Sequence, residues 1–316
     1  MKYLLNPVTD AAWNMAHDEF LLEGLQETVF CLWRNAPSVI IGLNQSAYAE
    51  VNLPFLRERG IQLARRVTGG GAVYHDLQNL NYSIAGPVRD MGQAFELMPA
   101  ALRRLGVPAE RSGRNDILVD GRKCSGYAKR LSRDRMMIHG TLMWDVDLET
   151  LTEALRVPGS KLEAAGIASV RSRVANLKSR LPAFSGIEDF RAALQDLLSG
   201  GDAEVRLTEA QRARIDAEAE GKFRTWAWIY GHSPESSFCN RRKFACGTVE
   251  VRYTLRHGLI EKLSFGGDFL GDRPASELAA LLVGRRTEEL DGLPVGDYFD
   301  GLSPADFAAL FHGEAV

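Results

Sequence analysis

The sequence predicts an α+β protein of two domains, a larger one in which helices cover a sheet and a smaller one at the C-terminal end. At 316 residues the chain exceeds one typical domain. Short strand-forming runs and helical apolar patterns recur along it. Residues 231–243 carry turn formers and clustered arginines with little periodic apolar content, which is typical of a linker. We therefore expect one domain over residues 1–232 and a second over residues 233–316.

Composition and charge exclude several classes of function. Hydrophobic residues make up 45% and charged residues 25%, as in an ordinary globular chain. The 38 basic and 41 acidic residues give a net charge of -3, which provides no global field for nucleic acid or anionic lipid. Pro7 interrupts the N-terminus before a signal-peptide core, and no apolar run of membrane-spanning length follows. We expect a cytoplasmic protein with no nucleic-acid or membrane partner.

The cysteines and histidines lack the spacing of a metal site. Four cysteines, at positions 31, 124, 239 and 246, show neither CxxC spacing nor the density of a disulfide scaffold. The six histidines include no HExxH motif. We therefore predict no structural metal ion.

Local signals predict the elements of the first half of the chain. Asp10 is placed to cap a helix that ends near Glu23. Residues 29–33 and 38–43 predict a hairpin, because an asparagine and a proline stand between them. Further signals predict a short helix ending at Gly60, strands over residues 61–66 and 80–85, and an amphipathic helix over residues 94–105.

A tight hairpin is expected around Asp120-Gly121, with strands over residues 117–119 and 122–125. Lys123 would then follow a rigid turn directly. The remaining patterns predict a strand over residues 135–144, helices over 148–156, 187–198 and 208–223, a C-terminal hairpin of residues 247–255 and 259–265, and helices over 276–283 and 304–311.

A glycine loop between two predicted strands reads RRVTGGGAVYHD over residues 65–76. Glycines let the backbone approach a ligand closely and expose several N–H donors, which suits phosphate. Arg65 and Arg66 add charged forks that match phosphate or carboxylate oxygens. The alternative is a glycine-rich hairpin with solvated arginines. Since neither GxxxxGK[ST] nor a GxGxxG turn is present, a different nucleotide-binding scaffold is required.

A second motif places Lys123 near a hairpin tip with glycines on both sides, in GRND over residues 113–116 and GRKCSG over 121–126. Where a carboxylate attacks the α-phosphate of ATP, negative charge builds on both partners. A lysine between them stabilises that transition state. The alternative is an ordinary solvated turn lysine.

Cys124 suggests a rival mechanism, in which a thiolate beside Lys123 forms an acyl thioester. Strand alternation argues against it, because it places Lys123, Ser125 and Tyr127 on one face and Cys124 on the other with Arg122 and Gly126. We expect Cys124 to be a small buried residue. His139 and Trp33 are minor candidates: each has a core-packing alternative, although an apolar tunnel for an acyl tail would also need such residues.

Together the motifs RRVTGGGAVYHD, GRNDILVDGRKCSG, HGTL (residues 139–142) and SVRSRVANL (residues 169–177), in this order, resemble the lipoate–protein ligase A family. The resemblance implies a catalytic domain of the biotin and lipoyl ligase fold, related to class II aminoacyl-tRNA synthetases, with a largely antiparallel sheet and flanking helices. It also implies a small C-terminal accessory domain and two reactions. Lipoate and ATP give lipoyl-AMP, and a carrier lysine then displaces AMP.

The resemblance assigns residues and partners position by position. Lys123 matches the lysine that touches the lipoyl carboxyl group and the phosphate. The nucleotide and acyl-adenylate contacts match Arg66, Gly71, Ala72, Val73 and Tyr74, and weaker transfers to the substrate pocket are Trp33, Arg65, His75, Asp116 and His139. ATP is implied as a substrate, with Mg²⁺ arriving on it. The implied acceptors are lipoyl domains of 2-oxoacid dehydrogenase complexes or the glycine cleavage H protein.

Two departures from the family pattern leave other activities open. Gln78 stands where the family usually carries glycine, and Cys124 replaces an aliphatic residue. The second keeps open an octanoyltransferase on the same fold, which uses a cysteine and no ATP. A non-catalytic acyl or adenylate sensor is a third possibility, because a fold does not fix a function.

Overall fold

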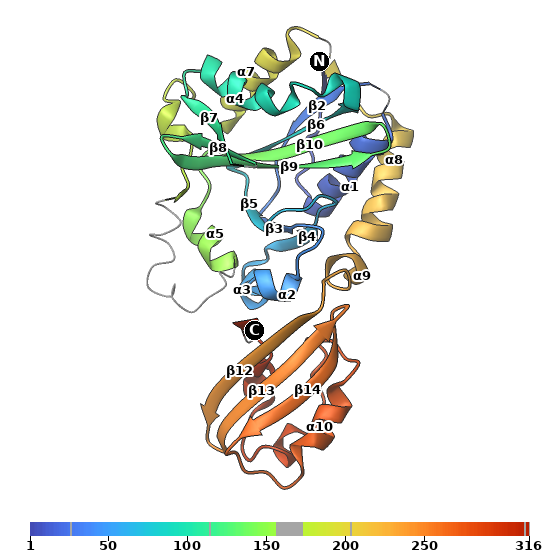
Figure 1. Ribbon diagram of the computed structural model, residues 1–316, viewed down its shortest axis with the longest axis vertical. Coiled ribbons are helices and arrows are strands. Elements are labelled where there is room, and N and C mark those ends of the chain that lie inside the picture. Colours follow the sequence, from blue (N-terminus) through green and yellow to red (C-terminus); the bar gives the residue numbers. More distant parts are fainter. Residues whose placement is uncertain (26, 114, 156–172, 203, 313, 316) are drawn as a thin grey trace. The chain divides into compact units, whose positions relative to one another are not determined.

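The computed structural model of the protein describes residues 1–25, 27–113, 115–155, 173–202, 204–312 and 314–315. Its contacts divide the chain into two units (Figure 1). The N-terminal unit comprises residues 1–43 and 51–225, and the C-terminal unit comprises residues 44–50 and 226–316. The predicted single boundary near residue 232 assigns the segment 44–50 to the first domain, whereas its contacts place it in the C-terminal unit.

An eight-stranded sheet forms the centre of the N-terminal unit, in the order β11-β1-β2-β6-β10-β9-β8-β7. β1 pairs in parallel with β11 and with β2, and the other neighbours pair antiparallel. The expected largely antiparallel sheet is confirmed. Its strands are β1 (Lys2–Leu4), β2 (Val29–Trp33), β6 (Asn79–Pro87), β7 (Ala109–Ser112), β8 (Asp116–Val119), β9 (Arg122–Ser132), β10 (Arg135–Met143) and β11 (Glu204–Val205).

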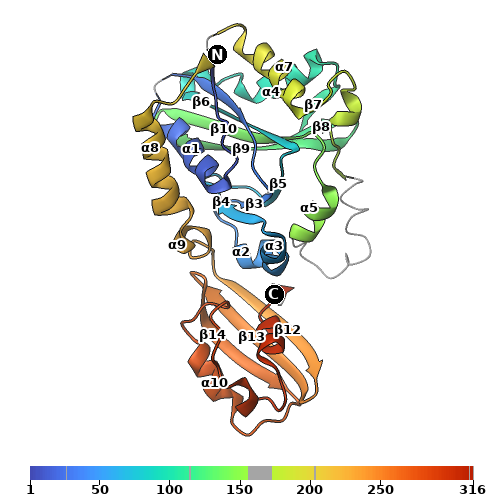
Figure 2. The ribbon, with the colours of Figure 1, turned by 180° about the vertical axis from the view of Figure 1, so that it is seen from behind.

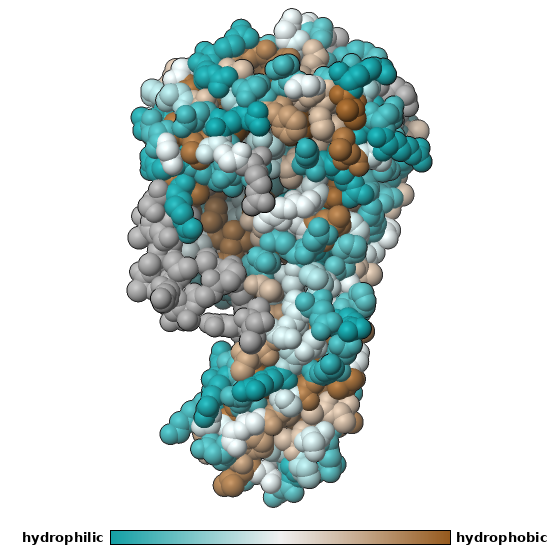
Figure 3. Space-filling model, viewed as in Figure 1, coloured by the Kyte–Doolittle hydropathy of each residue, from teal (hydrophilic) through white to brown (hydrophobic). Residues whose placement is uncertain are grey.

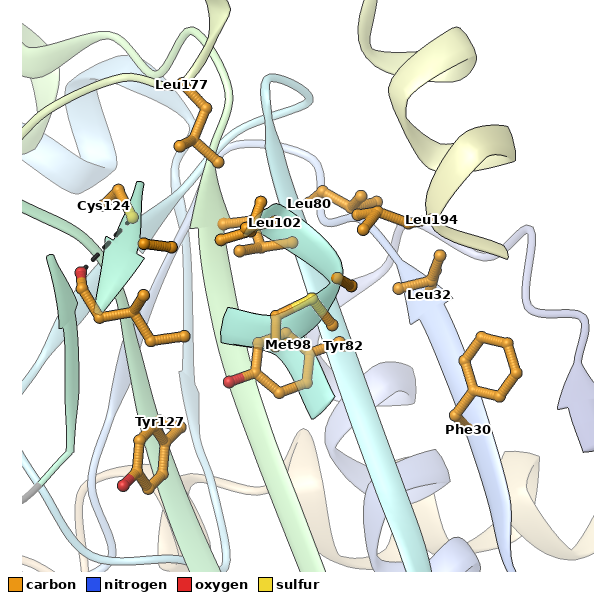
Figure 4. Close-up of a cluster of buried hydrophobic side chains, with 14 of the residues drawn as sticks. Phe30, Leu32, Leu80, Tyr82, Met98, Leu102, Cys124, Tyr127, Leu177 and Leu194 are labelled. Carbon is orange, nitrogen blue, oxygen red and sulfur yellow. Dashed lines mark hydrogen bonds between the residues drawn. The ribbon is translucent and has the colours of Figure 1, made fainter. Parts of the chain in front are cut away.

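Helices α4 (Ala94–Arg104) and α7 (Ile187–Ser199) cover one face of this sheet (Figure 1). The apolar stripe of α4 follows the predicted spacing, and Gly106 ends the turn with a φ of 90°. Figure 4 shows part of the core beneath these helices. It buries Phe30, Leu32, Leu80, Tyr82, Met98, Leu102, Cys124, Tyr127, Leu177 and Leu194.

Helix α1 (Ala11–Glu23) and a three-stranded sheet lie on the opposite face. The side chain of Asp10 accepts a hydrogen bond from the backbone N–H of Trp13, which confirms the predicted cap. The small sheet has the order β4-β3-β5, and α8 lies beside α1 (Figure 2). The elements on this side are β3 (Ser38–Ile41), β4 (Gln62–Arg65), β5 (Val73–His75), α3 (Leu53–Arg59), α5 (Leu148–Ala154) and α8 (Glu209–Glu218).

The predicted hairpin of residues 29–33 and 38–43 is wrong. β2 belongs to the eight-stranded sheet and β3 to the small one. The intervening residues do not close a turn between the strands, because they bind elsewhere. The Asn35 side chain contacts Asn14 and His75, and the N–H of Ala36 donates to the carbonyl oxygen of Thr9. Tertiary hydrogen bonds thus override the local turn signal.

Short helical turns complete the N-terminal unit. The sequence patterns did not predict them as separate elements, because each is only three to five residues long. They are the 3₁₀ turns Val88–Asp90 and Lys178–Arg180 and the π-helical turn Ala219–Phe223, which extends α8. The helix predicted over residues 208–223 therefore forms as α8 plus this turn. The helix predicted over 148–156 ends at Ala154, and residue 156 lies outside the described residues.

The C-terminal unit is built on an antiparallel sheet in the order β14-β13-β12-β15. β13 and β14 form the predicted hairpin, with His257 and Gly258 at φ of 50° and 74°. Residues 236–243, expected as part of a linker, belong to the strand β12 instead. The elements are α2 (Ala47–Glu50), α9 (Trp226–Ile229), β12 (Ser236–Phe244), β13 (Gly247–Arg256), β14 (Leu259–Gly267), α10 (Ala275–Leu282), the 3₁₀ turn Val295–Asp297, α11 (Pro304–Leu310) and β15 (Glu314–Ala315).

The surface mixes hydrophilic and hydrophobic residues on the face shown in Figure 3. Among the described residues, no helix is long and apolar enough to cross a membrane. The large hydrophobic side chains that are exposed are spread along the chain, at Leu77, Val88, Leu131, Leu270, Leu281 and Val283.

Candidate active site

A cavity lies against the face of the large sheet opposite α4 and α7. Trp33 of β2, Asn81 of β6, His139 of β10 and Gly126 of β9 line it, in the order in which these strands adjoin. Three strand spacings, roughly 14 Å, separate β2 from β9. The cavity thus runs across the strands as an elongated site. The remaining lining residues are Met15, Ile40, Arg66, Gly70, Gly71, Ala72, Val73, His75, Asn115, Lys123, Tyr127, Ala128, Gly140 and Thr141.

The glycine loop closes one side of the cavity, and Arg66 holds its shape. Nη2 of Arg66 donates to the carbonyl oxygens of Gly69 and Gly71 at 2.9 and 2.8 Å. Nη1 donates to the carbonyl oxygen of Ile40 at 3.1 Å. Burial lowers the pKa of Arg66 to about 10, so the guanidinium stays charged near neutral pH. Arg66 is therefore a buried brace for the loop.

Gly42 lets the glycine loop pack against strand β3. A Cβ added at Gly42 would lie 2.1 Å from the carbonyl oxygen of Gly70, and Gly70 itself has a φ of 96°. Gly70 and Gly71 are nevertheless exposed on their outer side. The loop is thus fixed from beneath and open to a ligand from outside.

Arg65 and Tyr74 do not line the cavity, in contrast to the other residues assigned to this loop. Arg65 is fully buried, and its Nη1 donates to the carbonyl oxygens of Gly42 and Leu43, both at 3.0 Å. It is therefore not the exposed anion fork that the motif suggested. Tyr74 alternates with Val73 and His75 along β5, so its ring points to the opposite face.

A chain of buried hydrogen bonds joins the loop to the far end of the cavity. Arg66 Nε donates to Thr68 Oγ1 at 3.0 Å, and Thr68 Oγ1 lies 2.7 Å from His139 Nε2. Nδ1 of His139 lies 2.6 Å from Asp18 Oδ2. Ser83 Oγ donates to Asp18 Oδ1 at 2.5 Å, and Trp33 Nε1 donates to Ser83 Oγ at 2.9 Å, where the chain ends. Sequence reasoning kept His139 and Trp33 as separate minor candidates, and the structure connects them.

Lys123 lines the cavity at its β9 end. Its Nζ lies 2.7 Å from Oδ1 of Asp116, and both side chains are partly exposed. The predicted hairpin around Asp120 and Gly121 is confirmed, with φ of 51° and 72° at these residues. The carbonyl oxygen of Lys123 also accepts the N–H of Ala175 at 2.8 Å. Val174 and Ala175 of the fourth motif thus lie beside Lys123, whereas Arg114 and residues 169–172 lie outside the described residues.

The predicted division of side chains along β9 is wrong, because the strand contains a bulge. Leu118 pairs with Lys123 but Ile117 pairs with Ser125, so Cys124 is an extra residue with no partner on β8. The alternation therefore shifts. Gly126 faces Lys123, since a Cβ there would lie 2.9 Å from Lys123 Nζ. Tyr127 was predicted to share a face with Lys123, but it packs in the same hydrophobic core as Cys124.

Cys124 is a buried core residue on the side of the sheet covered by α4 (Figure 4). Its Sγ donates to the carbonyl oxygen of Ile117 at 3.4 Å. Burial raises the pKa of the thiol to about 12, so the thiolate is not available near neutral pH. The conclusion that Cys124 and Lys123 point apart is confirmed, although the reason is the bulge.

Gln78 does not disturb the turn before β6. The backbone N–H of Gln78 donates to Oδ1 of Asp76 at 2.8 Å, and Oδ2 of Asp76 accepts the N–H of Asp147 at 3.0 Å. Gln78 is not among the residues with positive φ, so the turn requires no glycine.

Sequence reasoning missed several residues that build the site. Asp18 and Met15 lie on a helix that was assigned to packing, and Asn81 and Ser83 lie on a strand without a recognisable motif. A signal existed for Asp18, which is an acidic residue within the apolar stretch of α1. For Asn81 and Ser83, only the alternation of polar residues along residues 79–83 pointed to one shared face.

Comparison with solved structures places this fold among the lipoate protein ligases. A structural study of an archaeal lipoylation system, on a bi-partite lipoate protein ligase and its E2 lipoyl domain from Thermoplasma acidophilum, contains a chain that matches with a TM-score of 0.67 at 30% identity. The match covers 73% of this chain and 96% of that one. A crystal structure of lipoate-protein ligase A bound with ATP matches with a TM-score of 0.63 at 28% identity, covering 73% and 100%.

The chain belongs to the family of the lipoyl protein ligase A/B catalytic domain, which matches residues 10–199. Residues 233–311 match the bacterial lipoate protein ligase C-terminus. The lipoate-protein ligase LplJ of Bacillus subtilis is 36% identical over 96% of this chain and 98% of its own length. The resemblance read from the four motifs is thus confirmed over most of the chain.

Proposed function

We propose that this protein is an ATP-dependent lipoate–protein ligase. The observation that carries the proposal is the cavity itself, which leads from Trp33 to Lys123 and is flanked by the glycine loop. In the first step a lipoate carboxylate oxygen attacks the α-phosphorus of ATP, and pyrophosphate leaves. In the second step the amine of a carrier lysine attacks the acyl carbon, AMP leaves with the bonding electron pair, and the amine loses a proton.

Lys123 is the proposed catalytic residue. An ammonium at the β9 end of the cavity can contact both the lipoyl carboxylate and the α-phosphate, whose charges otherwise repel each other. Asp116 holds Nζ at 2.7 Å before the substrates enter. Because both side chains are partly exposed, Lys123 can exchange this partner for the substrate oxygens at modest cost.

The glycine loop is the proposed nucleotide contact, through backbone rather than charged side chains. Arg66 shapes the loop from beneath, and Gly71, Ala72 and Val73 line the cavity, where their N–H groups are the proposed donors to phosphate. We assign the backbone of Tyr74 to this contact as well, since its ring points away. Trp33, His75 and His139 are the proposed walls of the lipoyl pocket, and Arg65 supports the loop from within the core.

Mg²⁺ is proposed to enter with the triphosphate. This ion usually keeps several waters and binds through substrate phosphates and one or two carboxylates. Asp116 is a carboxylate beside Lys123 and could supply such a ligand once the lysine has turned to the substrates.

The proposed acceptor is a lipoyl domain, of 2-oxoacid dehydrogenase complexes or of the glycine cleavage H protein, and the proposed compartment is the cytoplasm. The E2 lipoyl domain in the archaeal study and the ligase names of the relatives support the acceptor. We also propose that residues 1–232 carry adenylation and transfer, and that residues 233–316 form an accessory domain.

The activity is tested by incubating the purified chain with lipoate, ATP and a lipoyl domain. AMP and pyrophosphate should be released, and the lipoyl domain should gain the mass of one lipoyl group. Omitting the lipoyl domain should leave lipoyl-AMP on the protein. A lipoyl domain that is not modified by lipoate and ATP, but gains an octanoyl group from an octanoylated carrier protein without ATP, would instead support the cysteine mechanism.

Lys123→Ala tests the catalytic assignment. The substitution removes an interaction that strengthens in the transition state, so we expect the rate of lipoyl-AMP formation to fall by roughly 10²–10³-fold. Since Lys123 is partly exposed, the unfolding temperature should change little. Single-turnover adenylation is the measurement, and Lys129→Ala, on the same strand, is the control. Near-normal turnover in Lys123→Ala would refute the role.

A further inference from the structure

Two buried hydrogen-bond donors belong to residues that line the cavity at its β2 end. Nε2 of His75 and the amide Nδ2 of Asn81 both belong to lining residues, which are 3% and 1% exposed. Neither atom has a hydrogen-bond partner among the described residues. Asn81 pairs with Trp33 in the sheet, and the His75 ring lies 6.3 Å from that of Trp33. Both donors therefore lie at the Trp33 end.

A chain of three asparagines determines which nitrogen of His75 carries the proton. The N–H of Val8 donates to Asn6 Oδ1 at 2.9 Å, so Asn6 Nδ2 donates to Asn14 Oδ1 at 2.8 Å. Nδ2 of Asn14 donates to the carbonyl oxygen of Val8 and to Asn35 Oδ1. Nδ2 of Asn35 is thereby left to donate to Nδ1 of His75 at 3.1 Å. Since Nδ1 accepts, the neutral ring carries its proton on Nε2.

The environment of His75 keeps this state near neutral pH. Burial, and then the charge of Arg66, lower the pKa of His75 to about 3, so the ring is neutral. The amide of Asn81 is held from its other side, where Oδ1 accepts from Nδ2 of Asn79 at 2.8 Å. The wall of the cavity therefore contains two N–H donors beside an indole ring, with no hydrogen-bond partner among the described residues.

The position of these donors becomes meaningful through the proposed function, on which this inference rests. With the carboxyl group at Lys123 on β9, the acyl chain runs across β10 and β6 toward β2. The distance of roughly 14 Å suits an extended medium-length acid. The donors thus meet the tail of the acid and lie far from the reacting carboxyl group.

We propose that His75 and Asn81 select an acyl tail that carries hydrogen-bond acceptors, such as the dithiolane sulfurs of lipoate, over a plain alkyl tail, and that Asn35 is a positioning residue for His75. Sulfur accepts hydrogen bonds weakly. An octanoyl tail accepts none, so it leaves both donors without a hydrogen-bond partner. A site built around donors rejects an analogue that lacks the acceptor more strongly than an apolar pocket rejects a missing methylene.

Acid binding to the full chain, measured by calorimetry without ATP, tests the selection. Lipoate should bind at least about tenfold more tightly than octanoate. In His75→Phe the ratio should shrink to within about threefold, whereas His75→Gln, whose amide can offer an N–H near the place of Nε2, should keep most of it. Asn81→Leu should also reduce it, and so provides a second reading if His75→Phe does not fold. An unchanged ratio in the folded apolar variants would overturn the proposal.

A second pair of acids separates hydrogen bonding from the size of sulfur. 8-Methoxyoctanoate carries an ether oxygen and no sulfur, and decanoate is its alkyl counterpart of equal length. The ether should bind more tightly than decanoate to the unmodified protein, and this difference in affinity should shrink in His75→Phe, which retains only the Asn81 donor of the pair. Equal binding to the unmodified protein would overturn the proposal. Because these are binding measurements, they remain informative even if no AMP is released, which would count against the proposed ligase alone.

Asn35→Leu tests the positioning role. In the unmodified protein the ¹⁵N signals of His75 should show the Nε2–H tautomer alone, whereas the variant should show both tautomers. The KM for lipoate should rise toward that for octanoate, while kcat with octanoate stays unchanged. If Asn35 had only a structural role, the variant would turn over both lipoate and octanoate more slowly, and His75 would keep the Nε2–H tautomer. An unchanged ¹⁵N pattern in the variant would exclude Asn35 as the positioning residue.

Discussion

At the scale of single residues, the site depends on where each charge or thiol is buried. Arg66 is buried but donates to carbonyl oxygens of the loop, so its charge serves the shape of the site. Lys123 is partly exposed and has one carboxylate partner, so its charge remains available to a substrate. The environments of Arg66 and Lys123 therefore suit different tasks, which the sequence alone could not separate.

Cys124→Ala separates the ligase from a cysteine acyltransferase. The thiol lies in the core and its pKa is raised to about 12, so its removal should leave ATP-dependent lipoylation within about twofold of normal. Stability should fall by about 1 kcal/mol, since one small buried group is lost. Steady-state AMP release and urea unfolding are the measurements. Loss of turnover with an intact unfolding midpoint would instead return the thiol to the mechanism.

His17 makes a residue-scale prediction about acid stability. Both of its ring nitrogens are buried without a partner among the described residues, and burial lowers its pKa to about 4. Between pH 6.5 and pH 4 the unfolded chain binds a proton that the folded chain does not. The neutral His17 therefore contributes fully to the free energy of unfolding above about pH 6.5. This contribution is lost as the pH falls, and the loss reaches on the order of 3 kcal/mol at pH 4.

The His17→Phe variant provides the comparison, since it keeps an aromatic ring beside Trp13. The free energy of unfolding, measured in urea at several pH values, should fall less steeply with acid in the variant. His75 titrates in both proteins, so the difference between them isolates His17. Parallel pH curves for the two proteins would show that His17 is not the group responsible.

At the scale of elements, local signals predicted those helices and hairpins that are held together by neighbours in sequence. The cap at Asp10, the left-handed Gly60 after α3 and the Asp120-Gly121 turn all formed as expected. The predicted pairing of β2 with β3 failed because Asn35 binds residues distant in sequence. The bulge at Cys124 carries no local signal, and it reversed the assigned faces of Ser125, Gly126 and Tyr127.

The bulge makes Gly126 part of the site, and Gly126→Ala tests this. The added Cβ would lie 2.9 Å from both Cε and Nζ of Lys123, so it should displace the flexible end of that side chain from the cavity. We expect adenylation to slow by at least about tenfold, with a loss of stability below about 1 kcal/mol. Gly92→Ala is the matched control, because a Cβ there meets nothing within 4 Å. Equal activities of the two variants would contradict this placement of Lys123.

At the scale of the whole molecule, the two compact units are not continuous stretches of the chain. The segment 44–50 interrupts the N-terminal unit in sequence but packs with residues 226–316. A boundary read from composition cannot reveal such an exchange, because it detects only a change along the chain. The family matches, over residues 10–199 and 233–311, likewise follow chain order and leave the segment in the first part.

Tyr48 anchors this segment and provides a test of the division. Its side chain is buried, its ring lies 5.7 Å from that of Tyr230, and its hydroxyl donates to the carbonyl oxygen of Gly258 at 3.4 Å. Tyr48→Ala should destabilise the C-terminal unit by on the order of 3 kcal/mol, as the loss of a buried aromatic ring does. Hydrogen exchange of the full chain should show faster opening of β13 and β14, with the amides of β6 and β10 unchanged. Tyr48→Phe, which keeps the ring and removes the hydroxyl group, should cost less than about 1 kcal/mol. Faster exchange in β6 and β10 instead would place α2 with the N-terminal unit.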